Sequence, residues 1–376
     1  MQLKHGVISA VDHVQEPPDI WFTRVNSKWG DRVPRLDRQA DRSDIWVIDG
    51  QQLPLSGAGS VGAMMPDRTI EPRTWADMPR AAWEPRARLE AMDRDGVDYS
   101  VLFPSVAGVA GENLNRIADP ELELACIQAY NDWLIDEWGA ASPRFVCQCL
   151  VPLSSIDAAI AEVRRSVARG HRGVIFPSIP MEIKALPHVN EPDWDPFWAA
   201  IAEANVPLVM PAGAPGPIQI PPDSSLSPRV ADAFRAITRA ASHVPVMVNF
   251  LLSRILLRHP TLRVVFAESA LGWVAYLLEY TDHQFREDGV HTEGYELNPS
   301  GMFHRQGYVT GWYDRSGVRT RDIIGVDNIM WSTMFPQATS SYPDTKDFVT
   351  RSFEGVPQDE REKILYGNAA KLYSLN

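Results

Sequence analysis

Eight short apolar runs, separated by longer segments with helical periodicity, limit this chain to a few architectures. The runs are mostly apolar on both faces, which is typical of parallel strands covered by helices. They are GVISAVDH (6–13), YSVLFPS (99–105), FVCQCLV (145–151), GVIFPS (173–178), VPLVMPAG (206–213), RVVFAES (263–269), QGYVTGWYD (306–314) and NIMWSTMFP (328–336). Eight strand–helix units in series predict an α/β fold, a closed (β/α)8 TIM-type barrel.

An open, doubly wound sheet is the alternative fold. Such a sheet usually carries a glycine-rich phosphate turn after its first strand, and VDHVQEPPD has none. A length of 376 residues suits one barrel domain over 1–376 with insertions. Residues 17–95 interrupt the alternation and are rich in Pro, Arg, Asp and Trp. We interpret them as a large insertion after strand one that covers the barrel mouth.

Sequence signals for helix ends are clear at two places. Asp119 precedes Pro120 and an acidic first turn, which predicts an N-cap and the start of a long helix. The amphipathic segment SSIDAAIAEVRRSVARG stops at Gly170, a residue type favoured just past a helix end.

Charge and cysteine content exclude several classes of partner. The formal net charge is -12, so the surface repels nucleic acid phosphates and anionic membranes. No apolar run reaches membrane-spanning length, and the first residues lack the apolar core of a signal peptide. Three cysteines give no disulfide framework and favour reduced, buried thiols in the cytoplasm. The segment VMVNFLLSRILL could pack at a homodimer interface or serve as a buried helix.

In a TIM-type barrel, catalytic groups lie at the carboxyl ends of the strands. Strand alternation puts Val11 and His13 on one face and Asp12 on the other, where it is expected to fix the first loop. The remaining strand ends offer Ser105, Pro177, Ser178, Pro211 to Gly213, Glu268, Ser269, Trp312 to Asp314, Met334 and Phe335.

Five segments resemble the amidohydrolase-2 family, which includes aminocarboxymuconate semialdehyde decarboxylase-like and resorcylate decarboxylase-like enzymes. They are VISAVDHVQEPPDIW, NEPDWDPFWAAIAEANVPLVMPAG, LLRHPTLRVVFAESALGWVAYLLEYTDHQF, NIMWSTMFP and ILYGNAAKLY. The resemblance spans nearly the whole chain. It implies a barrel that binds one divalent metal and acts as a lyase or hydrolase on a small molecule.

The metal ligands that the resemblance implies are largely replaced. The two strand-one positions fall on Val11 and His13, and the strand-five histidine falls on Pro211. The strand-six histidine falls on Glu268, and the strand-eight aspartate and the histidine that often follows it fall on Met334 and Gln337. A catalytic zinc normally has three protein ligands, and methionine offers only a soft thioether. We therefore expect no metal cofactor, with one Zn or Mn ion as the alternative.

His13 and Glu268 are the predicted catalytic residues. A neutral imidazole at a barrel mouth suits general acid or base catalysis near pH 7. A carboxyl group in an apolar mouth suits a general acid. The alternative is that both are structural, with their polar atoms satisfied by backbone or by an arginine.

Five further residues are predicted to contact substrate. His188 lies on the loop after strand four, and Trp312, Tyr313, Arg315 and Met334 follow strands seven and eight. Their structural alternatives are a solvated histidine, core packing of the aromatic rings, and a local ion pair of Arg315 with Asp314.

Three functions remain open from the sequence. The first is a metal-independent lyase that uses His13 and Glu268 on a small carbonyl compound or aromatic carboxylate, by decarboxylation, dehydration or cyclisation. The second is a metal-dependent hydrolase or decarboxylase with a rearranged site, in which His13 and Glu268, with or without His188, bind the ion and waters complete its shell. The third is a degenerate, non-catalytic binding protein. No G-x-S-x-G, P-loop, HExxH or paired CxxC motif indicates another chemistry.

Overall fold

The parallel strands run in the order that the sequence predicts. The structure is a computed structural model that describes residues 3–68, 70–212 and 225–375. Each of the eight predicted strands is present, and the third is divided in two by Cys147 and Gln148. The strands are β1 (Ile8–His13), β5 (Tyr99–Phe103), β6 (Phe145–Val146), β7 (Cys149–Leu150), β8 (Val174–Ile175), β9 (Leu208–Pro211), β10 (Val264–Ala267), β11 (Gly307–Gly311) and β12 (Ile329–Trp331). Gly213, in the predicted fifth strand, lies outside the described residues.

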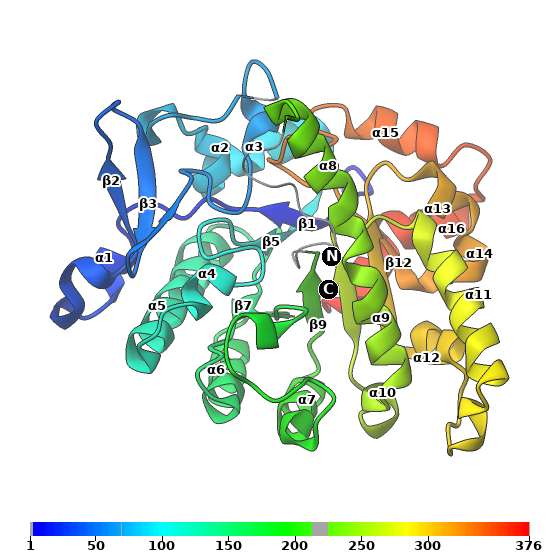
Figure 1. The fold of residues 1–376 in the computed structure, drawn as a ribbon. Coiled ribbons are helices and arrows are strands. Elements are labelled where there is room, and N and C mark those ends of the chain that lie inside the picture. The colour runs from blue at the N-terminus through cyan, green and yellow to red at the C-terminus, as the bar shows by residue number, and fades with distance from the viewer. Residues whose placement is uncertain (1–2, 69, 213–224, 376) are drawn as a thin grey trace.

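Backbone hydrogen bonds join these strands into a barrel (Figure 1). One parallel sheet has the order β1–β5–β6 and the other runs β7–β8–β9–β10–β11–β12. β6 and β7 belong to one run of chain, which connects the two sheets on one side. On the other side, Met334 donates its N–H to the Val11 carbonyl at 3.1 Å, and His13 donates to the Phe335 carbonyl at 2.6 Å. The predicted TIM-type fold is confirmed.

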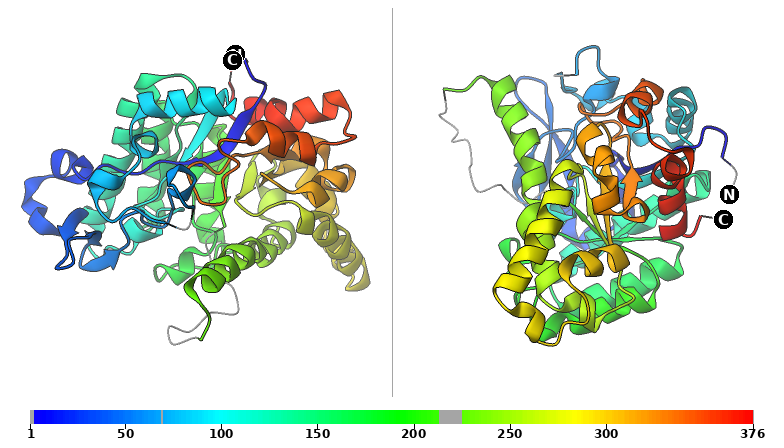
Figure 2. Two further views of the ribbon diagram at one scale, coloured as in Figure 1. Left: turned by 90° about the horizontal axis from the view of Figure 1, so that it is seen from above. Right: turned by 90° about the vertical axis from the view of Figure 1, so that its right-hand side faces the viewer.

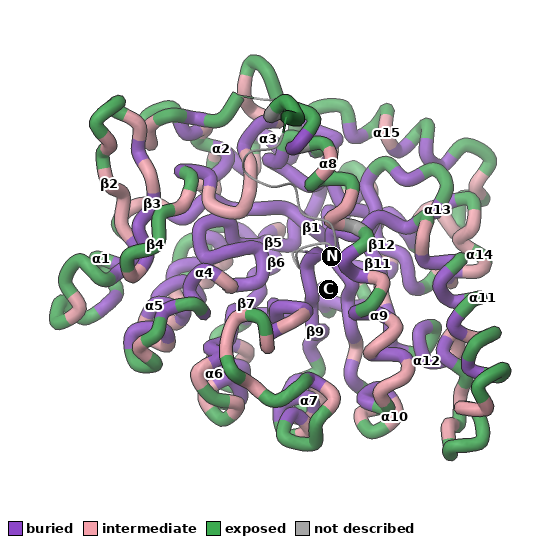
Figure 3. The backbone as a smooth tube through the Cα atoms, in the orientation of Figure 1, coloured by how far each residue is buried: buried purple, intermediate pink, exposed green. Residues whose placement is uncertain are grey.

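Helices surround the strands, with the capping that the sequence signals predict (Figures 1 and 2). The Asp119 carboxylate accepts the Glu121 N–H at 3.1 Å and starts α5 (Pro120–Trp133). α6 (Ile156–Ala168) ends just before Gly170, which has a φ of +110° and donates its N–H to the Val167 carbonyl at 3.0 Å. The outer turns are exposed and the strands are buried (Figure 3). The other long helices are α3 (Pro85–Asp95), α7 (Asp195–Glu203), α8 (Pro228–Ala241), α9 (His243–Leu252) and α11 (Gly272–Glu287).

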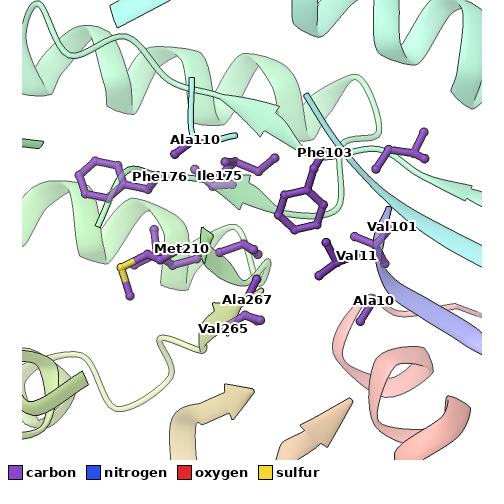
Figure 4. Packing of buried hydrophobic residues seen from close by; sticks show 14 of the residues in the cluster. Ala10, Val11, Val101, Phe103, Ala110, Ile175, Phe176, Met210, Val265 and Ala267 are labelled. Atoms are coloured by element: carbon purple, nitrogen blue, oxygen red, sulfur yellow. The ribbon is translucent and has the colours of Figure 1, made fainter. Parts of the chain in front are cut away.

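Apolar side chains from many strands fill one continuous core (Figure 4). Val11, Phe103, Phe176, Met210 and Val265 are each at most 1% exposed. Such packing is typical of a TIM-type barrel, whose centre is a core and not a pore. The three cysteines are free and buried, as expected. Among the described residues, no helix is long and apolar enough to cross a membrane.

The predicted insertion contains a small antiparallel sheet that the sequence analysis did not anticipate. Its strands are β2 (Arg35–Arg38), β3 (Asp44–Ile48) and β4 (Gln51–Leu53), between the short helices α1 (Ile20–Arg24) and α2 (Arg80–Trp83). α3 lies inside the predicted range 17–95, but it is the barrel helix that leads into β5. Ala58 donates its N–H to the Ser105 carbonyl at 2.9 Å, and Ala63 donates to the Pro336 carbonyl at 3.1 Å. Both carbonyls lie past strand ends, and the role of residues 17–95 as a cover over the mouth stays a prediction.

The segment considered for a homodimer interface is mostly internal. Val246, Met247, Phe250 and Leu251 of α9 are at most 5% exposed within the single chain. The buried-helix alternative accounts for these apolar residues, and a homodimer stays a prediction.

Asp12 ties β1 to both neighbouring strands at the seam of the barrel. Its carboxylate is buried and accepts four hydrogen bonds of 2.6–3.0 Å, from the hydroxyls of Ser9, Ser100 and Thr333 and from the N–H of Phe335. Burial raises the pKa of Asp12, and the nearby Arg88 guanidinium and the three hydroxyls oppose that rise. Asp12 therefore has a structural role, as its outward position on β1 predicts.

We expect the Asp12→Ala variant to lose about 3–5 kcal/mol of unfolding free energy, because Arg88 would then be a buried cation without its counter-charge. Urea unfolding followed by circular dichroism measures the change. Asp193→Ala, at an exposed carboxylate, is the matched control and should stay within about 0.5 kcal/mol of the parent. Equal stability of both variants would contradict this role for Asp12.

Candidate active site

His13 lies at the carboxyl end of β1, and both of its ring nitrogens have defined surroundings. The side chain is fully buried, and Nδ1 is 3.0 Å from the Pro104 carbonyl oxygen. Because a carbonyl oxygen only accepts hydrogen bonds, Nδ1 carries a proton. Nε2 is therefore the nitrogen that is free to exchange a proton, and it faces Glu268.

Glu268 follows β10 directly and has an unusual backbone conformation. Its φ of +62° lies in the left-handed region, which costs a residue with a side chain about 1–3 kcal/mol. The Glu268 N–H donates to the Thr310 hydroxyl at 3.0 Å and holds this conformation. Strained backbone that the surroundings maintain is frequent at functional sites.

The structure brings the two predicted catalytic side chains together. Nε2 of His13 is 3.3 Å from Oε1 of Glu268, and both side chains are 0% exposed. In the described part of the chain, neither this nitrogen nor either Glu268 oxygen has a well-aligned hydrogen-bond partner. A proton on either atom would be placed to form a hydrogen bond to the other.

Two residues near this pair were missed by the sequence analysis. Nη1 of Arg239, on α8, is 3.8 Å from Oε2 of Glu268. His243, at the start of α9, is fully buried, and burial lowers its pKa to about 4 against the opposing effects of the Pro211 carbonyl and Glu268. Arg239 lies near the end of α8 and His243 begins α9, so the two residues come from separate helices. Nothing in the sequence shows that the junction of these helices meets β10.

A cavity beside Pro211 lies next to the pair. Its empty volume is about 420 Å³, a figure that includes space open to solvent. Pro211 pairs with Ala267, the residue before Glu268. Burial raises the pKa of Glu112, which with Glu182 is one of two carboxyl groups in the cavity wall. The lining residues are Val109, Ala110, Glu112, Arg116, Pro177, Ser178, Ile179, Glu182, Ile183 and Pro211.

A buried carboxyl group fixes the loop that leads to this cavity. Glu16 accepts hydrogen bonds of 2.8–3.3 Å from the backbone N–H groups of Ser105, Val106 and Ala107. Burial raises the pKa of Glu16 to about 7, and these backbone donors oppose the rise. The cavity wall is thereby connected to the loop after His13.

Of the two aromatic residues after β11 that are predicted to contact substrate, one is buried and the other is exposed. Trp312 is 8% exposed and donates its Nε1–H to the Thr339 hydroxyl at 3.2 Å, whereas Tyr313 is 53% exposed. Met334 is buried at the seam with a left-handed φ of +57°. None of the three lines the cavity beside Pro211. Their substrate contacts stay a prediction.

Arg315 and His188 lie outside the cavity. Arg315 forms an ion pair with Glu354 at 2.7 Å, instead of the local pair with Asp314 that the sequence suggested. The Asp314 carboxylate accepts backbone N–H groups of Leu271, Gly272 and Gly317. His188 is exposed, and its Nδ1 accepts the Asn190 N–H at 3.3 Å. Substrate binding by Arg315 or His188 gains no support from these contacts.

The residues present do not fit the metal site that the family resemblance implies. Val11 and Met334 are buried apolar side chains at two ligand positions, and Pro211 has no donor atom to offer from a third. Over residues 3–68, 70–212 and 225–375, no group of three or more His, Cys, Asp or Glu side chains is arranged to hold a metal ion. His13 and Glu268 face each other instead.

The buried, neutral His243 gives a prediction for acid stability. Its folded-state pKa of about 4 lies below the ordinary value of 6.5, so its contribution is present above pH 6.5 and lost as the pH falls towards 4. We expect His243→Phe to reduce this acid destabilisation by up to about 3 kcal/mol, measured by urea unfolding between pH 7 and pH 4. His171, whose pKa burial also lowers to about 4, remains in both proteins. An unchanged pH profile would contradict the prediction.

Comparisons with known proteins identify the family. The sequence model described as Amidohydrolase matches residues 24–375, and no curated protein matches. An amidohydrolase structure from Mycobacterium avium subsp. paratuberculosis K-10 has a TM-score of 0.76 at 21% identity and covers 99% of this chain and 100% of its own.

Two decarboxylase structures share the fold at lower identity. Dihydroxybenzoic acid decarboxylase from Polaromonas sp. JS666, with bound manganese and the inhibitor 2-nitroresorcinol, has a TM-score of 0.67 at 18% identity and covers 99% of this chain and 98% of its own. 5-Carboxyvanillate decarboxylase from Sphingomonas paucimobilis has a TM-score of 0.67 at 19% identity and covers 99% of this chain and 100% of its own. The family match spans most of the chain and favours an enzyme of the lyase or hydrolase type, and the chain belongs to the amidohydrolase family.

Proposed function

We propose that this chain is a lyase that acts on a small carbonyl compound or aromatic carboxylate by proton transfer, without a metal ion. The observation that carries the proposal is the 3.3 Å contact between His13 Nε2 and Glu268 Oε1 in a fully buried setting. Decarboxylation is the reaction that the solved relatives favour, since the Polaromonas and Sphingomonas proteins are named as decarboxylases of aromatic acids. Dehydration and cyclisation remain within the same acid–base chemistry.

In a decarboxylation, the pair would act as general acid. The bond between the ring carbon and the carboxylate breaks, its electron pair stays on the ring carbon, and carbon dioxide leaves. The proton held between His13 and Glu268 then moves to that carbon. The hydrogen bond from Nδ1 to Pro104 keeps the ring oriented so that only Nε2 exchanges the proton.

Substrate would reach this pair through the cavity beside Pro211. Its apolar wall residues suit an aromatic ring, and Glu112 and Arg116 provide polar groups at the same wall. The packing of Phe103 at 5.8 Å from the His13 ring excludes bulk water from the pair. Exclusion of water protects a carbanion-like transition state from competing solvent.

One observation favours a non-catalytic binding protein as the second candidate. The side chains of His13 and Glu268 are 0% exposed, so substrate reaches them only if surrounding side chains shift. A degenerate enzyme that keeps the barrel and its cavity would show the same burial. Catalytic assays of variants at the pair distinguish the two candidates.

We expect His13→Asn and Glu268→Gln each to lower kcat by about 10²–10⁴-fold, because each removes one end of the proton pair. Carbon dioxide release from 2,6-dihydroxybenzoate and 5-carboxyvanillate, and deuterium incorporation into the products in D₂O, measure the effect. The exposed positions His283→Asn and Glu279→Gln serve as matched controls. Turnover that survives both substitutions at the pair would overturn the proposed mechanism, and a parent protein that binds these acids without turnover would favour the binding protein.

Removal of metal should leave activity unchanged. We expect less than about 0.1 equivalent of Zn or Mn per chain after dialysis against a chelator, because a catalytic zinc needs about three protein ligands and the described residues supply no such set. Elemental analysis of untagged protein, with activity assayed before and after addition of Mn²⁺ or Zn²⁺, tests this. One metal per chain that is required for turnover would establish the metal-dependent alternative.

A further inference from the structure

A second cavity lies at the opposite end of β1 from His13. Its empty volume is about 740 Å³, and its walls come from the segment before β1, the end of α3, the helix α15 (Thr345–Ser352) and the helical segment that begins with α16 (Gln358–Glu362). The lining residues are Lys4, His5, Gly6, Val7, Asp95, Gly96, Thr345, Lys346, Val349, Arg361 and Leu365. His13 and Glu268 are not among the residues that line it.

A buried carboxylate fixes the segment that carries Lys4 and His5. Asp98 is 4% exposed, and its two oxygens accept the backbone N–H groups of residues 4 to 7 at 2.7–3.4 Å. The first wall of the cavity is therefore ordered by the fold, although it lies near the chain terminus. Because both Asp98 oxygens accept backbone N–H groups, Asp98 does not pair with the side chains of Lys4 and His5.

Asp95 fixes the opposite wall in a similar way. Its carboxylate accepts the Thr345 N–H at 3.1 Å and the Thr345 hydroxyl at 2.7 Å, which sets the first turn of α15 and the position of Lys346. Gly96 then turns the chain with a φ of +78°, and a Cβ at this position would lie 3.8 Å from the His5 ring. The positive φ, and not a lack of space, is what favours glycine here.

Three cations face this cavity without a partner. In the described part of the chain, the side chains of Lys4, Lys346 and Arg361 form no hydrogen bond or ion pair, and Arg361 is half-buried. Asp95 is the only acid among the lining residues, and Thr345 occupies both of its oxygens. Elsewhere arginines pair closely with acids, as Arg321 does with Glu360 at 2.6 Å. An unpaired cation cluster is unusual in a protein whose net charge is -12.

From this arrangement we propose that the cavity binds a small multivalent oxyanion, a phosphorylated compound or a polycarboxylate. The backbone of the walls is already ordered, so binding of such an anion orders only the three cationic side chains, and charge-assisted hydrogen bonds hold it. A monovalent anion such as chloride gains much less from the same three charges. This site is independent of the proposed lyase activity.

Isothermal titration calorimetry with pyrophosphate and with citrate tests the proposal, against sodium chloride at equal ionic strength. We expect one site per chain for at least one of the two probes, and which one binds distinguishes the phosphate from the carboxylate source. Lys346→Gln and Arg361→Gln should each weaken binding about tenfold, and the double variant about a hundredfold. Arg286→Gln, at an exposed and unpaired arginine of α11, is the matched control and should bind as the parent does.

Thermal unfolding in the absence of anion shows whether each variant is folded, and Lys4→Gln, at an exposed position, provides a test that does not depend on Arg361. Absence of binding by both probes at millimolar concentration would overturn the proposal. Binding that Lys4→Gln and the double variant leave unchanged would overturn it as well, because the anion would then lie elsewhere.

Discussion

The buried carboxylate of Asp12 determines how the barrel closes, and the position of His13 depends on that closure. Asp12 and His13 are neighbours on β1, so strand alternation turns one towards the seam and the other towards the centre. Arg88, which balances Asp12, donates through Nη2 to the His13 carbonyl at 2.6 Å and lies over the Phe335 ring at 4.4 Å. The same charge pair that joins the strands therefore fixes the backbone of the candidate catalytic histidine.

The cost of burying charge without a metal ion explains which residues occupy the replaced ligand positions. Carboxylates at positions 11 and 334 would be buried without a cation, at a cost of several kcal/mol each, whereas Val11 and Met334 fill the space without that cost. Glu268 is the carboxylate that remains, and it retains two sources of compensation. Nε2 of His13 lies 3.3 Å from one of its oxygens, and Nη1 of Arg239 lies 3.8 Å from the other.

The sequence was sufficient for the fold because each strand and cap has a local cause. Each of these signals spans only a few neighbouring residues: the apolar runs predict strands, Asp119 before Pro120 predicts a helix start, and the glycine after α6 predicts a helix end. It was also sufficient for the pairing of His13 with Glu268, since the carboxyl ends of β1 and β10 meet at one mouth. The sheet β2–β4 was missed, because its short strands alternate weakly and depend on the burial of Trp46 against the barrel. Arg239 and His243 were missed because a helical pattern does not reveal which strand a helix face meets.

β1 connects two sites with opposite electrostatic character. At its carboxyl end, the buried side chains of His13 and Glu268 face each other, and at its amino end, the cationic residues Lys4, Lys346 and Arg361 line an open cavity. Coupling between two sites requires an element with two arrangements, and the structure shows β1 in one arrangement, paired with β5 through an irregular register between Ser9 and Asp12. An anion at the amino end is therefore expected to act through mass action on the folded state, by stabilising the walls that Asp95 and Asp98 already order. The anion is expected to raise the stability of the barrel, whereas proton transfer at His13 depends on the local geometry of the pair.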